Sequence, residues 1–336
     1  MAELKELTLA QRFSMIALNA QRSNMMTTVK KISLRTIAAA VILEVYLEDG
    51  LTAGAKGHIE GAVVPGKEIS TGDLAYRELI LKAVGSKARD RQPKLPWWLK
   101  KASSLPKRTL ARFELVMAKG LADLGRMEEI PNLLGCDMFY ESAGVSIKEY
   151  RCPIDEYTRI TEGFRAEILE EGPVSDDAVC LLWLLRESGC LPDLFSRNEL
   201  DLVATRIGEL DTSHSLAHMI FPIQIYRGWE IAVKDALRIK RSFIRSTVGT
   251  GMLFLFPLLD RSQAVFIETE AWFSNSKQRL EAVKNRLEAQ GHVFTVLKEG
   301  EIPTIKIDNL VYEVVPHYVT VRVPIQGVRL LPKRPI

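Results

Sequence analysis

Apolar residues recur at the helical period through most of the first 213 residues. Leu7, Phe13 and Ile16 mark a first helix, which ends near residues 23–24. Residues 33–48 are apolar on nearly every side, which is typical of a helix buried in a core, and Asp49-Gly50 ends it. The same period predicts further helices at residues 74–84, 105–124, 154–170, 176–188 and 198–209. An extended, turn-rich pattern at residues 51–64 predicts a short β-hairpin, and residues 126–150 are predicted to form a second hairpin or an irregular loop.

The pattern changes after residue 213. A long helical pattern spans residues 224–246, where Lys234, Arg238, Arg241 and Arg245 share one face. Strand and helix patterns then alternate, with strands at 264–269, 292–297, 304–315 and 318–325 and a helix at 276–290. We therefore expect a mainly α protein, a compact helical bundle with short β-hairpins followed by a small α+β C-terminal module. The predicted divisions are a helical domain at 1–213, a basic connecting helix at 214–251 and the α+β module at 252–336.

Composition indicates a globular protein. Of the 336 residues, 47% are hydrophobic and 26% are charged. No apolar run approaches the roughly 20 residues that span a bilayer, and the first residues lack the layout of a secretory signal. The four cysteines, Cys136, Cys152, Cys180 and Cys190, form no C-x-x-C pair, so neither a zinc site nor a disulfide framework is expected. These features predict a cytoplasmic protein, and peripheral attachment to a membrane is compatible with them.

Catalytic motifs are missing from the chain. It contains no G-x-S-x-G, no P-loop, no dinucleotide-binding G-x-G-x-x-G and no H-E-x-x-H. His214 and His218 have helical spacing but no evident third metal ligand. We therefore predict that the protein is not an enzyme and needs neither a cofactor nor a metal.

Five blocks in order carry a family resemblance. They are LTLAQRFSMIAL (7–18), AAAVILEVYLEDGL (38–51), TGDLAYRELI (71–80), RFELVMAKGLADLG (112–125) and the pair AVCLLWLLRESGCL with ELDLVATRIGEL (178–210). Over residues 5–212 the chain resembles the Golgi phosphoprotein 3-like family. The resemblance implies a compact helical bundle. It also implies peripheral membrane binding, because eukaryotic members bind phosphatidylinositol 4-phosphate and the cytoplasmic tails of glycosyltransferases.

The chain departs from the family at the lipid headgroup. The family uses a Trp and three Arg, and the aligned positions here are Val29, Ala38, Ala111 and Glu114. None of these side chains supplies the forked, charge-assisted hydrogen bonds that a phosphorylated headgroup requires. Basic residues that lie a few positions away are the candidates for a relocated anionic site: Lys30, Lys31, Arg35, Lys107, Arg108 and Arg112. The alternative is that these residues are ordinary solvated charges.

The richest basic tract runs from Lys87 to Arg112, where Asp90 is the only acidic residue. Trp97 and Trp98 lie within it beside Lys100 and Lys101, a combination that suits an anionic membrane surface. A Trp in the core is the alternative for this pair. Nucleic-acid phosphates are a less favoured partner for the cations. In the loop that follows, apolar side chains could enter lipid, close the core or contact another subunit: Leu133, Leu134, Met138 and Phe139.

The leading hypothesis is a non-enzymatic peripheral-membrane protein that binds an anionic, phosphoinositide-like surface through its helical domain. The alternative is a soluble scaffold or oligomerisation protein without a lipid ligand, whose C-terminal module docks a protein partner or a second copy.

Overall fold

The structure is a computed structural model, and it describes most but not all of the chain. The described residues are 6–19, 21, 23, 26, 28–48, 74–85, 94–131, 148–225, 265–268, 275–289, 292–307, 310–320 and 324–333. The predicted hairpin at 51–64 lies outside them. So do most of the predicted connecting helix at 214–251 and the apolar loop residues Leu133, Leu134, Met138 and Phe139.

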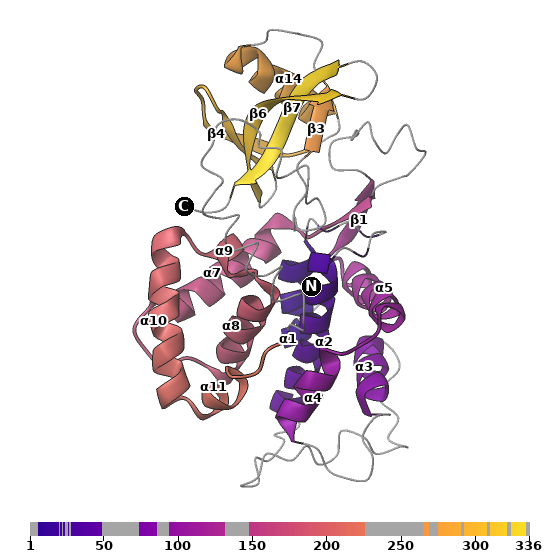
Figure 1. Cartoon of the computed structure of the whole chain (residues 1–336), viewed down its shortest axis with the longest axis vertical. Coiled ribbons are helices and arrows are strands. Elements are labelled where there is room, and N and C mark those ends of the chain that lie inside the picture. Colours follow the sequence, from indigo (N-terminus) through magenta and orange to yellow (C-terminus); the bar gives the residue numbers. More distant parts are fainter. Residues whose placement is uncertain are drawn as a thin grey trace, which may run out of the picture.

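In the part of the chain that the structure describes, the helical region contains the helices from α1 to α11 and one pair of short strands. Its helices are α1 (Leu9–Leu18), α2 (Thr28–Glu48), α3 (Ala75–Gly85), α4 (Leu95–Ala102), α5 (Lys107–Asp123), α7 (Ile154–Leu169), α8 (Asp176–Ser188), α9 (Leu191–Leu194), α10 (Arg197–Ser213) and α11 (Ser215–Ile220). Strands β1 (Glu128–Pro131) and β2 (Lys148–Arg151) pair antiparallel. Helix α2 runs through the middle, with α3 and α5 on one side and α8 and α10 on the other (Figure 1). None of the helices in this described part is long and apolar enough to cross a bilayer.

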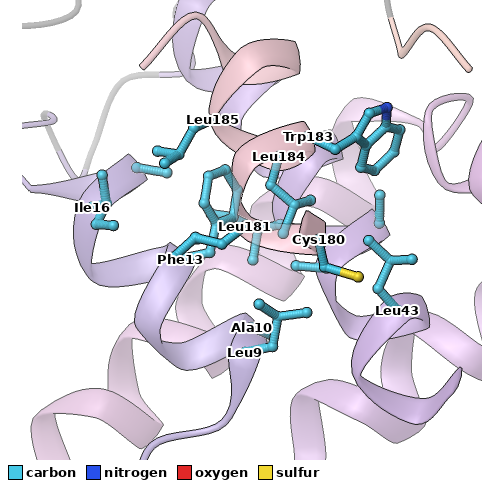
Figure 2. Close-up of a cluster of buried hydrophobic side chains, with 14 of the residues drawn as sticks. Leu9, Ala10, Phe13, Ile16, Leu43, Cys180, Leu181, Trp183, Leu184 and Leu185 are labelled. Atoms are coloured by element: carbon cyan, nitrogen blue, oxygen red, sulfur yellow. The ribbon is translucent and has the colours of Figure 1, made fainter. Parts of the chain in front are cut away.

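The core forms where α1, α2 and α8 meet. Figure 2 shows Phe13 of α1, Leu43 of α2 and Leu184 of α8 converging on one cluster. All three side chains are fully buried, and the Trp183 indole N–H donates to the backbone oxygen of Ile223 at 3.1 Å. Because residues 33–48 of α2 are apolar on nearly every side, the helix packs against helices on both of its flanks, as the sequence predicts.

Local sequence signals set the helix ends. Thr8 and Gln11 form a capping box at the start of α1, and Ser196 and Glu199 form another at the start of α10. Ser175 caps α8, which ends at Gly189 in the left-handed conformation with φ 73°. These caps satisfy backbone N–H groups that no helical carbonyl can reach.

A buried ionic network joins α1, α2 and α3. The Glu44 carboxylate accepts hydrogen bonds from the Ala10 amide at 2.8 Å and the Tyr76 hydroxyl at 2.9 Å, and it pairs with Arg77. Arg77 also donates to Glu48 at 2.6 Å. Because Glu44 is almost fully buried, these contacts compensate its desolvation and fix α3 against α2.

The described residues of the C-terminal module form a five-stranded antiparallel sheet and one helix. The strands β3 (Val265–Glu268), β4 (Phe294–Lys298), β5 (Thr304–Ile307), β6 (Leu310–Thr320) and β7 (Pro324–Lys333) have the order β3-β7-β6-β5-β4. Helix α14 (Ser276–Ala289) packs Leu280, Val283 and Leu287 on alternate sheet residues such as Tyr312 and Val314. This cluster is separate from the helical core.

The mainly α fold with a small α+β C-terminal part is confirmed. The division of the chain at residues 213 and 251 stays a prediction. Two strand assignments were wrong. Residues 304–315 were expected to form one strand, but they belong to β5 and β6. Residues 318–325 were also expected to form one strand, but residues 318–320 continue β6 and β7 starts at Pro324. The regular alternation of valines from Val319 to Val323 gives no sign in the sequence of where β6 ends.

Candidate functional site

Lys30 lies inside the molecule, in the first turns of α2. Its side chain is 1% exposed, and its ammonium pairs with the Glu114 carboxylate of α5. The ammonium also donates to the Ser23 carbonyl at 3.0 Å and lies 5.7 Å from the centre of the Tyr150 ring. An external headgroup cannot reach this ammonium, so we remove Lys30 from the candidate lipid ligands.

Glu114 completes this internal cluster. Its carboxylate accepts a hydrogen bond from the Tyr150 hydroxyl at 3.1 Å. Burial raises the pKa of Glu114 and lowers the pKa of Lys30, and each effect is opposed by the attraction between the two groups. Burial also raises the pKa of Tyr150, with the Glu114 charge adding to it. The cluster ties α2, α5 and β2 together, which is a structural role.

The positions that align with the family's headgroup ligands are largely internal. Val29, Ala38 and Glu114 are buried, and Ala111 is half-buried. Two of the nearby candidates are also withdrawn from solvent, since Arg35 is buried and Lys31 half-buried. Anion binding at this end of α2 is therefore not supported by surface cations.

The other candidates lie on the outside, where α4 ends and α5 begins. Lys100 is exposed, and Lys101 is half-buried in the last turn of α4. Lys107, Arg108 and Arg112 are exposed on α5. We call these five residues the basic corner. From Lys94 to Phe113 the chain has six basic residues and no acidic one.

The two tryptophans of this tract have different environments. Trp98 is 3% exposed and packs into the core, so it is not a membrane-surface residue. Trp97 is half-buried, meets the Trp98 ring edge-on at 5.5 Å between centroids, and lies under the Lys101 ammonium at 5.4 Å. One indole therefore belongs to the fold and the other borders the basic corner.

Helix polarity adds to the positive potential of the basic corner. The first turn of α5 contains Lys107 and Arg108 and no acidic residue, and Pro106 gives no side-chain cap. These cations lie at the end where the helix dipole is positive, an arrangement that an anion would stabilise. No carboxylate of a described residue forms an ion pair with Lys107, Arg108 or Arg112.

No family model, curated protein or solved structure matches this chain. The family resemblance is accordingly still a prediction, and the functional argument depends on the geometry of the chain itself.

A small cavity of about 190 Å³ lies among α1, α7 and α8. Arg12, Arg159 and Phe164 line it, but Arg12 pairs with Asp177 at 2.6 Å and Arg159 with Glu156 at 2.5 Å. Its charges are thus already compensated. No group of His, Cys, Asp and Glu able to hold a metal occurs among the described residues.

Sequence reasoning missed Leu115, which lies on the outer face of α5 with its side chain 65% exposed. A signal was available, because Leu115 falls off the buried stripe of α5 formed by Leu110, Phe113, Met117 and Leu121. At 3.6 residues per turn, Leu115 instead shares a face with Arg108, Arg112 and Lys119.

Proposed function

We propose that this protein is a non-enzymatic peripheral-membrane protein that binds anionic membrane surfaces through the basic corner. The observation that carries the proposal is the cluster of cations at the α4–α5 junction, in a stretch with no acidic residue. Lys107, Arg108 and Arg112 are exposed and have no described carboxylate partner.

The energetics favour such a surface. Each basic side chain near an anionic bilayer contributes roughly 1 kcal/mol, so the five residues together supply about 5 kcal/mol. That energy corresponds to a change in affinity of several thousandfold, by the rule of about 1.4 kcal/mol per factor of ten. The half-buried Trp97 adds an indole ring of the kind that is enriched at membrane interfaces.

Vesicle flotation tests the proposal. The wild-type chain should float with vesicles that contain phosphatidylserine and stay behind with neutral vesicles. The double variant Lys107→Glu, Arg108→Glu should bind at least about 30-fold more weakly, because two favourable charges become unfavourable. The matched control is Lys277→Glu, Lys298→Glu, which makes the same charge change at two exposed residues of the C-terminal module. Equal loss in both variants, or no flotation of the wild type, would refute the proposal.

A second candidate function, a homo-oligomeric scaffold, is supported by strand β4. This strand lies at one edge of the described sheet. Two apolar side chains at this edge are solvent-exposed: Val293, just before β4, at 76%, and Leu297, within β4, at 52%. Edge strands with exposed apolar side chains are templates for pairing with another chain.

The residues of β4 are complementary to a second copy of themselves. In an antiparallel pairing centred on Thr295, Val293 faces Leu297 of the second copy on one side of the sheet. On the other side Phe294 faces Val296, and both are half-buried in the single chain. Lys298 then lies beyond the apolar pairs. A five-residue edge is only about 17 Å long, so the resulting dimer would be weak.

Cysteine cross-linking tests this candidate. In the proposed register Thr295 meets its own copy, so Thr295→Cys should form a disulfide-linked dimer under mild oxidation. The control Lys277→Cys, on α14, should not. Cross-linking should disappear when Leu297→Lys is added. Similar yields from both cysteines would rule out pairing through β4.

A further inference from the structure

The outer face of α5 carries a row of cations with one apolar residue among them. Arg108, Arg112, Leu115 and Lys119 follow one another at spacings of three and four residues, so they share one side of the helix. All four are exposed. Of the two acidic residues of this helix, Glu114 faces inward and is buried in its pair with Lys30. Asp123 is exposed at the last position of the helix, four residues beyond Lys119.

A second exposed leucine gives a natural comparison. Leu202 on α10 is 60% exposed, close to the 65% of Leu115. The neighbours of Leu202 three and four residues away on α10 are Asn198, Glu199, Thr205 and Arg206. Arg206 is half-buried and pairs with Glu209 at 3.1 Å. An isolated exposed leucine is ordinary. What distinguishes Leu115 is that the cations on its helix face, Arg108, Arg112 and Lys119, are exposed.

We propose that α5 lies along the membrane surface, with Leu115 in the interfacial layer and Arg108, Arg112 and Lys119 at the level of the lipid phosphates. This inference depends on the proposed membrane function and adds the face that contacts lipid and the class of lipid. An amphipathic helix with cations beside an apolar residue binds a bilayer in this way, through buried apolar area together with attraction to anionic lipid.

The same geometry defines the ligand as anionic lipid in general. From Arg108 to Lys119 the row extends about 16 Å along the helix, at a rise of 1.5 Å per residue. Cations in a row on a convex helix face contact several lipids, whereas selection of one phosphorylated headgroup needs donors that converge on it. The internal positions where the family resemblance expects such donors hold Val29, Ala38 and Glu114. Recognition therefore follows the charge density of the membrane.

An environment-sensitive dye on α5 tests the insertion. Leu115→Cys is labelled with nitrobenzoxadiazole in a Cys136→Ser background, where the remaining thiols, Cys152, Cys180 and Cys190, are buried. Vesicles of phosphatidylcholine with phosphatidylserine should shift the emission to the blue and increase its intensity. The same dye at Leu202→Cys is the matched control and should not respond. Leu115→Gln should weaken vesicle binding about tenfold, because the transfer free energy of one partly exposed leucine side chain is lost. Leu202→Gln should not weaken vesicle binding.

Lipid composition tests the ligand class. Vesicles with phosphatidylserine and vesicles with phosphatidylinositol 4-phosphate, matched in total charge, should bind the wild-type chain within about twofold of each other. A preference above tenfold for the phosphoinositide would overturn the inference.

The remaining outcomes separate the inference from the proposed function. Flotation with a silent dye at residue 115 overturns the inference and leaves the membrane function standing. Absence of flotation with every anionic vesicle overturns both. A dye response to a poly-glutamate peptide but not to vesicles would identify α5 as a protein-docking face, and would also overturn the inference.

Discussion

The two sides of α5 treat basic residues in opposite ways. On the inner side, Lys30 is buried against Glu114 and Tyr150 and is closed to any ligand. On the outer side, Arg108 and Arg112 are exposed, and no described carboxylate pairs with them. Basic side chains on the two sides of α5 thus have different roles. Lys30 of α2 stabilises the fold, whereas Arg108 and Arg112 of α5 remain available to a partner.

This difference shows why sequence distance from a family motif is a poor guide to a binding site. The predicted resemblance would place a headgroup ligand beside Lys30, at Val29, yet Lys30 is buried in its pair with Glu114. Arg108 and Arg112 combine positive charge with access to solvent, as do Lys107 and Lys119. If these roles are distinct, changes to the buried Lys30–Glu114 pair should affect stability, and changes to the exposed cations of α4 and α5 should affect vesicle binding.

Loss of the inner pair should have the largest effect. Glu114→Ala leaves the Lys30 ammonium buried without its carboxylate, and removal of one partner of a buried pair costs about 3–5 kcal/mol. Urea denaturation should show this loss in the free energy of unfolding. The double variant Lys30→Met, Glu114→Leu should recover most of it, because apolar side chains need no compensation. A single variant as stable as the wild type would show that the pair does not hold the fold.

The Glu114→Ala variant should also acquire a specific pH dependence. Burial already lowers the pKa of Lys30 from its ordinary 10.5, and Glu114 opposes this change. Without Glu114 the pKa of folded Lys30 falls further, so between that pKa and 10.5 the unfolded chain binds more protons than the folded chain. The free energy of unfolding of the variant should therefore rise as the pH increases toward 10.5, relative to the wild type. A decline across this range would contradict the assignment.

Alanine variants of Trp97 and Trp98 should differ clearly in their free energy of unfolding. Trp98→Ala empties a buried site and should lower the free energy of unfolding by about 3 kcal/mol. Trp97→Ala should lower it by less than about 1 kcal/mol, because the ring is half-exposed, and should weaken vesicle binding instead. If the two variants lose similar stability, the division between the core and the basic corner is not as drawn.

Salt should weaken vesicle binding by the exposed cations and leave the buried Lys30–Glu114 pair almost unchanged. Raising sodium chloride from about 0.05 M to 0.5 M shortens the Debye length several-fold and should weaken vesicle binding tenfold or more. The coupling energy between Lys30 and Glu114, measured by a double-mutant cycle in urea, should change by less than about 0.5 kcal/mol, since buried charges are screened little. Vesicle binding that is insensitive to salt would argue against an electrostatic surface.

Local signals predicted much of the helical part. The helix at 176–188 agrees with α8, where Ser175 and Gly189 fix both ends. Helix α2 begins at Thr28 rather than residue 33. The sequence did not predict this start, because the first turns are polar and contain Lys30, whose burial depends on a distant partner. The region expected as one helix from residue 105 starts at Lys107, after Pro106.

The site was less predictable, because it depends on contacts between distant segments. The sequence near residue 30 does not predict that Glu114 lies opposite Lys30, or that Tyr150 of β2 contacts the pair. Likewise the adjacent residues Trp97 and Trp98 read alike in the sequence, although helix geometry turns one inward and the other toward Lys101. Only Leu115 had a usable signal in its position on the α5 helix, opposite the buried stripe.

Lysine footprinting on membranes tests the central claim most directly. Acetylation with and without phosphatidylserine vesicles, read by mass spectrometry, compares inner, outer and remote lysines in one sample. We predict that Lys30 is unmodified in both states, that vesicles protect Lys100, Lys107 and Lys119, and that the exposed Lys277 and Lys298 react equally in both. Acetylation of Lys30 in the native protein, or protection of Lys277 and Lys298 in place of the α4–α5 lysines, would contradict the account.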